Sequence, residues 1–432
     1  MDITSGSFSG DPAVLYARAS GVSIDTRTLS PGDLYVAIVG GSLDGHAFAD
    51  AAMAQGACCC LTDRAVTAPH IRVADTVAAL HEITLAYRQL FDIALVGVTG
   101  SVGKTTVKEM LYAVLSKHYV THKSKANLNN QTGVPQTLLG ISRAHQIAIV
   151  EMGTNHFGEI RELSRIAEPT ICIFTNIGEA HMEFFGSREG IFRAKTEMLA
   201  HMRAGGAIIA NGDDALLAAI PGAITYGLSP RCAVYADELE PHGLAGTAFT
   251  AHFFGNTLRL SVPAPGAHMV QNALCAIALG HQMGLTADEL RQGLEDFHAS
   301  AGRMDVQKTE RFTLLNDAYN ASPSSMRASI DVLTAEPGRR VCIFGDMLEL
   351  GERAPDYHAE VGRYAAKRGV DLLLCVGSLA KFAANQPYAH WFSTQEELLA
   401  ALPALLRDGD TILVKASYGM QLTRTVQAIM DM

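Results

Sequence analysis

The stretch of the chain with the clearest chemistry is residues 95–109, which read Leu-Val-Gly-Val-Thr-Gly-Ser-Val-Gly-Lys-Thr-Thr-Val-Lys-Glu. An apolar run predicts a strand, a glycine-rich turn follows, and Lys-Thr-Thr then opens a helical pattern. Small residues at Gly100 and Gly103 let backbone N–H groups close around phosphate oxygens. Lys104 can reach the β- and γ-phosphates of a nucleotide, and the Thr105 hydroxyl can bind Mg²⁺.

The spacing of this loop differs from the common G-x-x-x-x-G-K-[ST] pattern, because Val98 stands where the first glycine would be. What remains, T-G-x-x-G-K-T-T, is a narrower variant. A strand–helix turn without any ligand is the alternative interpretation. This segment combines a predicted strand, a turn, a lysine, paired threonines and a predicted helix. That combination favours a nucleotide site.

Polar side chains also stand at the ends of other predicted strands. They are Glu151, Thr175 and Asn176, Asn316 and Asp317, Asp346, and Lys415. In open α/β sheets, ligands bind beyond the carboxyl ends of the strands. Each of these residues alone could equally cap a helix or belong to a turn. Five such strand ends in one chain predict clefts lined by ligand-binding groups.

Three residues near the expected cleft have more than one interpretation. Glu151 fits a Mg²⁺ ligand or a carboxylate that positions water, and otherwise caps a helix. His181 lies in a loop near the same edge, where a lone histidine is more often structural. Lys195 falls in the apolar stripe of a helix predicted over 187–202. It therefore needs a partner, a shifted pKa or a modification, unless its stem extends to solvent.

Residues 125–135, Lys-Ala-Asn-Leu-Asn-Asn-Gln-Thr-Gly-Val-Pro, carry three closely spaced asparagines. Their amides supply donors and acceptors for a polar ligand. A turn rich in Asx residues is the alternative interpretation.

Composition limits the class of protein. A chain of 432 residues with 48% hydrophobic and 18% charged residues predicts a globular protein of two to four domains. Its net charge of −10 argues against broad nucleic-acid binding. The 8 cysteines include no C-x-x-C pair, and we find no signal peptide or transmembrane stretch. We therefore expect a cytoplasmic protein with no integral membrane segment.

Strand and helix patterns divide the chain into three blocks, 1–88, 89–301 and 302–432, with a glycine-containing hinge predicted at 299–304. In the second and third blocks strands alternate with helices, which predicts right-handed βαβ units and mostly parallel, doubly wound sheets. We expect a three-domain α/β protein with a small mixed N-terminal domain, a central domain holding the phosphate loop and a Rossmann-like C-terminal domain.

The motifs and their order resemble the Mur ligases, the ATP-dependent amide-bond-forming enzymes of peptidoglycan precursor synthesis. The resemblance covers all three blocks and rests on T-G-S-V-G-K-T-T (99–106), N-L-N-N (127–130), V-E-M-G (150–153), T-N-I-G-E-A-H-M-E (175–183), H-M-V-Q-N-A-L (268–274), D-A-Y-N-A-S-P (317–323), F-G-D-M-L-E-L-G (344–351), and the N-terminal D-T-R-T-L-S-P-G-D (25–33) and D-G-H-A-F (44–48).

The resemblance is greatest to the member that adds a dipeptide, and it implies ligation of D-alanyl-D-alanine to UDP-N-acetylmuramoyl-tripeptide with ATP and Mg²⁺. ATP would convert the terminal carboxylate of the tripeptide to an acyl phosphate, which the dipeptide amine attacks. The three blocks would then be a UDP-sugar-binding domain, an ATPase domain and a domain that closes on ATP and the amine. We expect a monomer.

The resemblance also implies roles for individual residues. Lys104, Glu151, His181 and Lys195 would be catalytic, and Thr105, Glu151, His181 and a carbamylated Lys195 would hold magnesium. The nucleotide would contact Gly100, Ser101, Val102, Gly103, Lys104, Thr105, Thr106, Asn272, Arg303 and Asp317. The substrates would contact Thr26, Arg27, Asp44 and His46 at the UDP-sugar end, Asn127, Asn130 and Thr132 along the muramoyl peptide, and Asn320, Ser322 and Ser324 near the dipeptide.

The chain departs from the family pattern at three places. Val39 stands where relatives often have a lysine, Ser322 replaces a usual asparagine, and residues 416–418 read Ala-Ser-Tyr instead of Gly-Ser-Arg. Three alternatives to the dipeptide-adding activity are the ligase that adds the third amino acid, folylpolyglutamate synthase, and a nucleotide-gated switch or binding protein. The two N-terminal motifs disfavour the folate enzyme, and two further ligand-lined blocks exceed what a switch requires.

Overall fold

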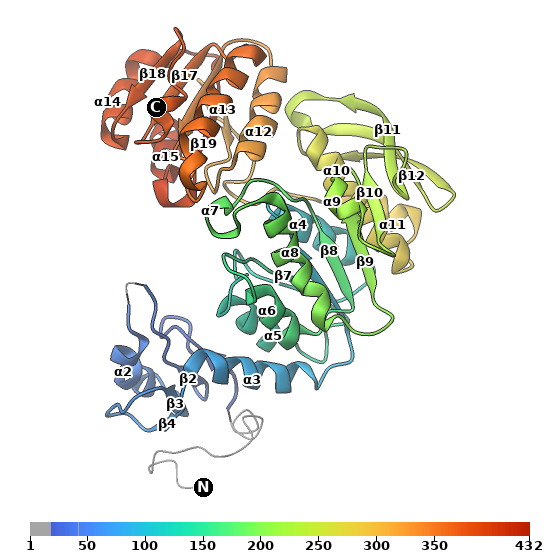
Figure 1. Cartoon of the computed structure of the whole chain (residues 1–432), viewed down its shortest axis with the longest axis vertical. Coiled ribbons are helices and arrows are strands. Elements are labelled where there is room, and N and C mark those ends of the chain that lie inside the picture. Colours follow the sequence, from blue (N-terminus) through green and yellow to red (C-terminus); the bar gives the residue numbers. More distant parts are fainter. Residues whose placement is uncertain (1–18, 42) are drawn as a thin grey trace.

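The computed structural model describes residues 19–41 and 43–432. Three sheets follow one another along the chain (Figure 1). Among the described residues, no helix is both long enough and apolar enough to cross a membrane. The expected α/β fold is confirmed, whereas the limits of the three domains stay a prediction.

The first sheet is small and all its strand pairs are parallel, in the order β1-β2-β3-β4. Its elements are β1 (Val22–Ser23), β2 (Leu34–Val36), α2 (Ala49–Ala54), β3 (Cys59–Thr62), β4 (His70–Arg72) and α3 (Thr76–Arg88). Alternate residues of β2 face opposite sides, as the pleat requires. Leu34 packs in the cluster that includes Leu80 of α3, and Tyr35 packs in the one that includes Ala52 of α2.

The second sheet is the largest, in the order β13-β12-β11-β10-β9-β8-β5-β7-β6. Its strands are β5 (Ala94–Thr99), β6 (Thr121–Lys123), β7 (Ile147–Glu151), β8 (Ile171–Phe174), β9 (Ala207–Asn211), β10 (Ile224–Gly227), β11 (Val234–Pro241), β12 (Thr247–Phe253) and β13 (Asn256–Val262). Strands β5 to β11 pair in parallel, and β11, β12 and β13 are antiparallel. The antiparallel strands β12 and β13 therefore extend this sheet at one edge.

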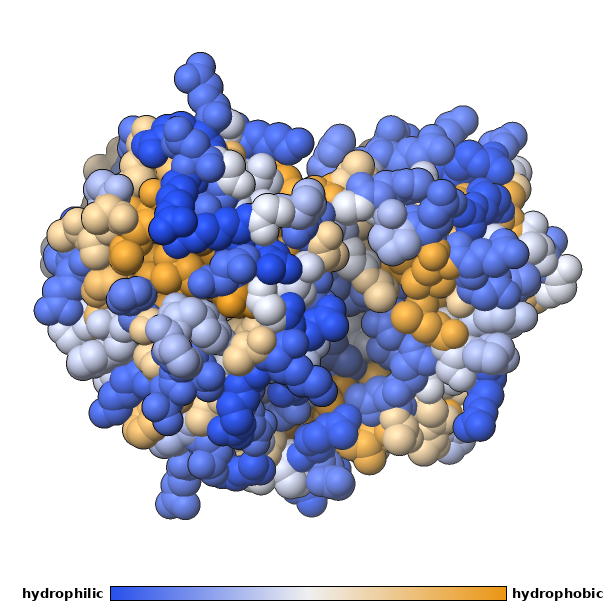
Figure 2. All heavy atoms as spheres, turned by 90° about the horizontal axis from the view of Figure 1, so that it is seen from above, coloured by the Kyte–Doolittle hydropathy of each residue, from blue (hydrophilic) through white to orange (hydrophobic). Residues whose placement is uncertain are grey.

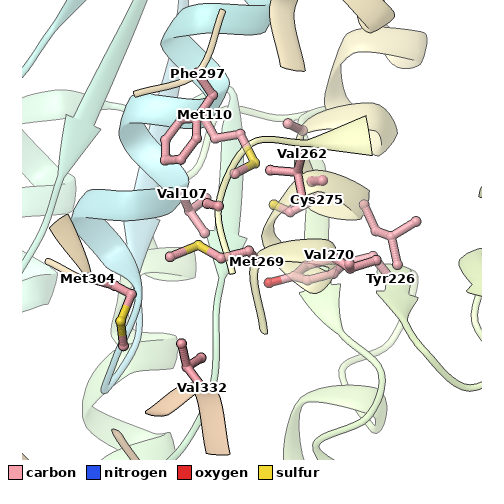
Figure 3. Packing of buried hydrophobic residues seen from close by; sticks show 14 of the residues in the cluster. Val107, Met110, Tyr226, Val262, Met269, Val270, Cys275, Phe297, Met304 and Val332 are labelled. Carbon is pink, nitrogen blue, oxygen red and sulfur yellow. The ribbon is translucent and has the colours of Figure 1, made fainter. Parts of the chain in front are cut away.

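Helices cover both faces of the second sheet. They are α4 (Lys104–Leu115), α5 (Gly133–Leu139), α6 (Glu159–Ala167), α7 (Met182–Phe185), α8 (Arg188–Thr196), α9 (Ala215–Ala218), α10 (Ala267–Gln282) and α11 (Ala287–Glu295). Helices α4, α10 and α11 contribute to one apolar cluster, and α5, α6, α8 and α9 contribute to the other. Figure 3 shows Val107 and Met110 of α4 near Met269 of α10, with Met304 and Val332 close by. The core thus continues into the third block.

The third sheet has the order β14-β15-β19-β16-β17-β18, with only the β14–β15 pair antiparallel. Its elements are β14 (Asp305–Lys308), β15 (Thr313–Asn316), α12 (Pro323–Ala335), β16 (Arg340–Gly345), α13 (Ala354–Arg368), β17 (Leu372–Val376), β18 (Ala389–Phe392), α14 (Gln395–Leu405), β19 (Thr411–Lys415) and α15 (Thr423–Met430). Helices α12 and α13 cover one face, and α14 and α15 cover the other. Seen from above, the surface is largely hydrophilic and hollowed between two lobes (Figure 2).

The helix predicted over 187–202 is wrong in its second half. Helix α8 ends at Thr196, and a 3₁₀ helix over Glu197–His201 follows. Tertiary hydrogen bonds hold this second segment: the hydroxyl of Ser164 donates to the Met198 carbonyl at 2.6 Å, and Gly158 N–H donates to Glu197 Oε2 at 2.8 Å. These contacts come from elsewhere in the chain, so the local apolar period could not reveal them.

Candidate active site

The phosphate loop joins β5 to α4 and requires glycine at two positions. Gly103 has φ +84° as the residue before α4, and Gly100 has φ +154°. A Cβ at Gly100 would lie 1.9 Å from the hydroxyl oxygen of Thr175, which is far inside the contact distance of two non-bonded atoms. The loop and the end of β8 are therefore in direct contact.

Residues after β8 support this loop. Ser101 N–H donates to the Asn176 carbonyl at 3.0 Å, and Val102 N–H donates to Asn176 Oδ1 at 2.9 Å. The Thr175 hydroxyl donates to the Val102 carbonyl at 2.6 Å. The first N–H groups of α4 have no partner within the helix, so they form the anion-binding part of the loop. The loop is built before any ligand arrives.

Lys104 turns back over this loop. Its ammonium donates to the carbonyls of Gly100 and Ser101, at 2.9 and 3.4 Å. Burial lowers the pKa of Lys104, and nearby Arg303 lowers it further, whereas Glu151 raises it. Among residues 19–41 and 43–432 this ammonium has backbone carbonyls and no carboxylate as partners, so an anionic group bound in the loop would attract it.

Glu151, at the end of β7, is buried beside the first turn of α4. Its Oε2 accepts from the Thr105 hydroxyl at 2.9 Å, and its Oε1 accepts from the Asn129 amide at 2.8 Å. The two expected magnesium-binding residues are thus in contact. Oxygen donors of this kind are what Mg²⁺ prefers. Asn129 is one of the three asparagines that the sequence pointed to as partners of a polar ligand, and in the structure its amide fixes this carboxylate.

Lys195 and His181 have very different surroundings. Lys195 on α8 is 1% exposed, and among residues 19–41 and 43–432 no hydrogen bond or ion pair of its ammonium is found. Burial lowers the pKa of Lys195 well below its ordinary value, and Lys104 lowers it further. His181 has φ +61°, and its Nδ1 lies 2.5 Å from Glu349 Oε2 in the third block.

A cavity of about 640 Å³ lies between the second and third blocks. The expected residues that line it are Ser101, Val102, Gly103, Lys104, Thr105, Thr106, Asn127, Asn130, Thr132, Glu151, His181, Asn272, Arg303, Asp317, Asn320, Ser322 and Ser324. Of the expected residues of these two blocks, Gly100 and Lys195 do not line it. The phosphate loop and the start of the third block therefore share one cavity.

Asp317, in the third block, makes side-chain contacts to three separate parts of the chain in this cavity. Its Oδ2 lies 2.5 Å from the Lys415 ammonium and accepts from the Ser329 hydroxyl at 2.6 Å, while Oδ1 accepts from Met304 N–H at 3.1 Å. The guanidinium of Arg303 lies 4.0 Å from the centre of the Tyr319 ring. Asp317 thus ties the hinge to the third sheet.

Three family models together match most of the chain: the Mur ligase family catalytic domain over 18–90, the Mur ligase middle domain over 98–280, and the Mur ligase glutamate ligase domain over 302–418. The Escherichia coli UDP-N-acetylmuramoyl-tripeptide–D-alanyl-D-alanine ligase is 36% identical, with 100% of this chain and 97% of the relative aligned.

The chain belongs to the Mur ligase family.

Two solved structures extend this result. MurF from Acinetobacter baumannii has a TM-score of 0.89 at 32% identity and covers 95% of this chain and 93% of its own. MurF from Thermotoga maritima, solved in complex with ADP, has a TM-score of 0.87 at 26% identity and covers 98% of both chains. The fold of this Mur ligase is therefore that of MurF over nearly its whole length.

The expected UDP-sugar residues of this Mur ligase do not line the large cavity. Arg27 is exposed and pairs with Asp25, with Nη2 and Oδ2 2.6 Å apart. His46 is buried between Asp44, at 2.7 Å from Nδ1, and the N–H of Asp63, at 3.3 Å from Nε2. These residues and Thr26 belong to the first block, so the structure leaves them apart from the phosphate loop.

Several of the expected cavity residues also have local structural roles. Asn130 Oδ1 accepts from the N–H groups of Thr132 and Gly133, at 3.2 and 2.9 Å, as an Asx turn does. Ser322 caps α12 and forms a capping box with Ser325. Asn130 and Ser322 therefore shape the backbone of the cavity as well as facing it.

Proposed function

We propose that this Mur ligase joins D-alanyl-D-alanine to UDP-N-acetylmuramoyl-tripeptide with hydrolysis of ATP to ADP and phosphate. The observation that carries the proposal is the shared cavity, in which a phosphate loop faces polar side chains of the third block. The E. coli relative, aligned over the whole chain, has the same activity in its name. A ligase that transfers phosphate from ATP to the tripeptide and then admits the dipeptide needs one cavity in which all three reactants meet.

The reaction follows from the chemistry of the reactants. A carboxylate is a poor electrophile, so its oxygen first takes the γ-phosphoryl group of ATP, and ADP leaves. The free amine of D-alanyl-D-alanine then attacks the carbonyl carbon of the acyl phosphate. The bond to the phosphate oxygen breaks, and phosphate and a proton are released. The protein mainly positions the reactants and balances their negative charge.

We assign the phosphates of ATP to residues 100–106, with Lys104 near the γ-phosphate. The Lys104 ammonium, which donates to the Gly100 carbonyl in this structure, would turn toward that phosphate. Asn272, Arg303 and Asp317 would hold the rest of the nucleotide. Asp317 belongs to the third block, so movement of that block about the hinge would deliver it.

The donors in the cavity fit magnesium. Thr105 and Glu151 would hold one ion, because the hydroxyl on the first turn of α4 and the carboxylate at the end of β7 lie 2.9 Å apart. His181, which lines the cavity, and Lys195, which is buried outside its lining, would hold a second ion, but an ammonium cannot bind a cation. Lys195 fits only as a carbamate, and the lowered pKa of its buried amine favours the neutral form that reacts with CO₂. Bound magnesium supplies positive charge for the phosphate oxygens.

The substrate ends are assigned by block. Asn127, Asn130 and Thr132 would contact the muramoyl peptide, and Asn320, Ser322 and Ser324 would contact the dipeptide. Thr26, Arg27, Asp44 and His46 would bind the UDP-sugar. We place the protein in the cytoplasm, where ATP and uridine nucleotides occur, and expect it to act as a monomer.

The test is phosphate release from ATP with UDP-N-acetylmuramoyl-tripeptide, with and without D-alanyl-D-alanine, and mass spectrometry of the product. We expect release only with both substrates and a pentapeptide product. Release with a dipeptide precursor and a single amino acid instead would assign the chain to the ligase for the third residue. Release independent of any amine would favour a nucleotide-gated switch.

A further inference from the structure

Lys108 is a fully buried lysine on α4, three residues after Thr105. Its side chain is not part of the lining of the large cavity. Burying an ammonium is costly unless charged or hydrogen-bonding partners surround it. The partners of Lys108 therefore indicate what its position achieves.

The ammonium of Lys108 has three partners from three parts of the chain. It donates to the Ala126 carbonyl at 2.9 Å, and it lies 3.2 Å from Glu109 Oε1 and 3.6 Å from Glu151 Oε2. The other oxygen of Glu109 pairs with Lys123. Lys108 thus stands between the carboxylate of β7 and the turn that follows β6.

Both of these partners belong to sites of the proposed reaction. Glu151 is the carboxylate that meets Thr105 and Asn129. Ala126 directly precedes Asn127, which lines the cavity, and has φ +46°. An alanine adopts this left-handed conformation only at a cost, so the hydrogen bond from Lys108 helps to hold the turn.

A purely structural ion pair would need only Glu109. The contacts with Ala126 and Glu151 do more, because through them helix α4 fixes the positions of a carboxylate and a backbone turn relative to each other. Asn129 closes the same arrangement from the other side, since it lies in the turn and donates to Glu151. The turn, the carboxylate and the phosphate-loop helix therefore form one connected unit.

We propose that Lys108 is a positioning residue, whose buried ammonium locks Glu151 and the Ala126 turn onto the phosphate-loop helix. It thereby sets the distance between the ion-holding carboxylate and the path of the muramoyl peptide. This inference rests on the proposed function, which assigns the ion to Glu151 and the peptide to Asn127 and Asn130. Loss of Lys108 should therefore affect metal and tripeptide binding, and leave the dipeptide side unaffected.

The experiment compares Lys108→Met, Lys108→Arg and Lys123→Met with the unaltered protein. Binding of Mn²⁺ in the presence of ADP is measured by electron paramagnetic resonance, and binding of UDP-N-acetylmuramoyl-tripeptide by calorimetry. We expect K108M to weaken both by about tenfold or more, as loss of a residue that orients a metal ligand does. K108R should recover part of the loss, and the KM for D-alanyl-D-alanine should not change.

Lys123→Met is the matched control, because it removes a lysine of the same ion-pair chain that touches only Glu109 and an aromatic ring. It should bind both ligands like the unaltered protein. Circular dichroism and ADP binding establish that each variant is folded. If K108M does not fold, Lys108→Gln, which retains a donor for the Ala126 carbonyl but no charge, should show the weakened Mn²⁺ binding.

Two results would overturn the inference: a folded K108M (or K108Q) with unchanged binding of Mn²⁺ and tripeptide, or a K123M as impaired as K108M. The proposed function fails separately, if the unaltered protein shows no amine-dependent phosphate release. In that case the Mn²⁺ comparison still decides whether Lys108 positions Glu151.

Discussion

The central sheet meets its two neighbours in opposite ways. Helix α3 packs on α5 and α6. His81 is buried there between Glu162, at 2.8 Å, and the Gln131 carbonyl, at 2.7 Å. Arg88 is buried beside it and donates to three backbone carbonyls. We call these contacts the α3 interface. Its described polar groups are paired, and Gln131 lies within the proposed substrate turn.

The contact with the third block is sparser, and we call it the C-terminal interface. His181 meets Glu349, and Arg327 lies 3.4 Å from Glu179 Oε1, while Glu179 Oε2 is buried without a hydrogen-bond partner. The large cavity occupies the space between. A region with few buried contacts opens more readily than one with many. Although the apolar cluster continues into the third block, these sparser polar contacts predict that the third block moves more readily than the first.

Lys195→Ala should have the largest effect of the substitutions considered, and it should change turnover without lowering stability. We expect turnover to fall by at least about 10²-fold, the loss seen when a charge that stabilises a transition state is removed. Stability should not fall, because the change removes a buried amine for which we find no hydrogen bond or ion pair among residues 19–41 and 43–432. Coupled phosphate assays and thermal unfolding measure both quantities.

Small carboxylates should partly restore the activity of K195A if the lysine acts as a carbamate. Lys117→Ala, which removes a lysine paired with Asp296, is the control and should remain active. Turnover near that of the unaltered protein in K195A would contradict the metal-ligand assignment.

Arg88→Met should have the largest effect on stability. The substitution leaves the carbonyls of Ala167, Phe91 and Ile93 without their donor. We therefore expect the free energy of unfolding, measured in urea, to fall by about 3 kcal/mol. Below the transition the kcat should be unchanged. Arg424→Ala, which breaks an exposed pair with Glu396, is the control. A loss as small as that of the control would show that the α3 interface is not strongly held.

Glu162→Gln should weaken the same interface less. Hydrogen bonds from Arg165 and His81 lower the pKa of Glu162 from 4.5 to about 2, although burial opposes them. Because the folded pKa is depressed, the stabilisation is complete above pH 4.5 and is lost as the pH falls toward 2. The side chain is 35% exposed, so solvent screening limits the effect to about 1 kcal/mol.

Urea unfolding of E162Q and the unaltered protein at a series of pH values measures this contribution. The two curves should converge on acidification. A difference in stability that persists below the folded pKa would mean that Glu162 acts through packing instead of charge.

Glu349→Gln should have the smallest effect, at the C-terminal interface. The pair with His181 is partly exposed and is worth about 1 kcal/mol or less, so the KM for ATP should rise by about fivefold at most. X-ray scattering with an ATP analogue and the tripeptide should show less compaction, with an unchanged melting temperature. Glu352→Gln changes a neighbouring carboxylate as control. A lowered melting temperature in E349Q would mean that this interface is permanently closed.

The sequence predicted the elements whose signals are local. Strands β7, β16 and β19 end at or next to the polar residues Glu151, Asp346 and Lys415, as the sequence predicted, because buried parallel strands are apolar almost throughout. The phosphate loop was readable because its glycines and its lysine are close together in the chain. Short strands such as β6 and β18, which are only partly buried, gave no such signal.

Most of the residues expected in the second and third blocks from the family pattern line the cavity, but the contacts that orient them were not predicted. The contacts of Asn129 and Lys108 are recognised only when β7, α4 and the turn after β6 are seen together. The signal for Lys108 in the sequence was its position, three residues after Thr105 and therefore on the same side of α4. Long-range contacts of this kind depend on the register of packed elements, which composition and spacing do not specify.

The close approach of Gly100 to Thr175 has a consequence for inhibitor design. A side chain at Gly100 would collide with a residue that itself supports the loop, so a single substitution there cannot be absorbed by a small local shift. A compound that binds through the backbone of this loop contacts positions that the chain has little freedom to change. Resistance by mutation would then have to arise elsewhere in the cavity.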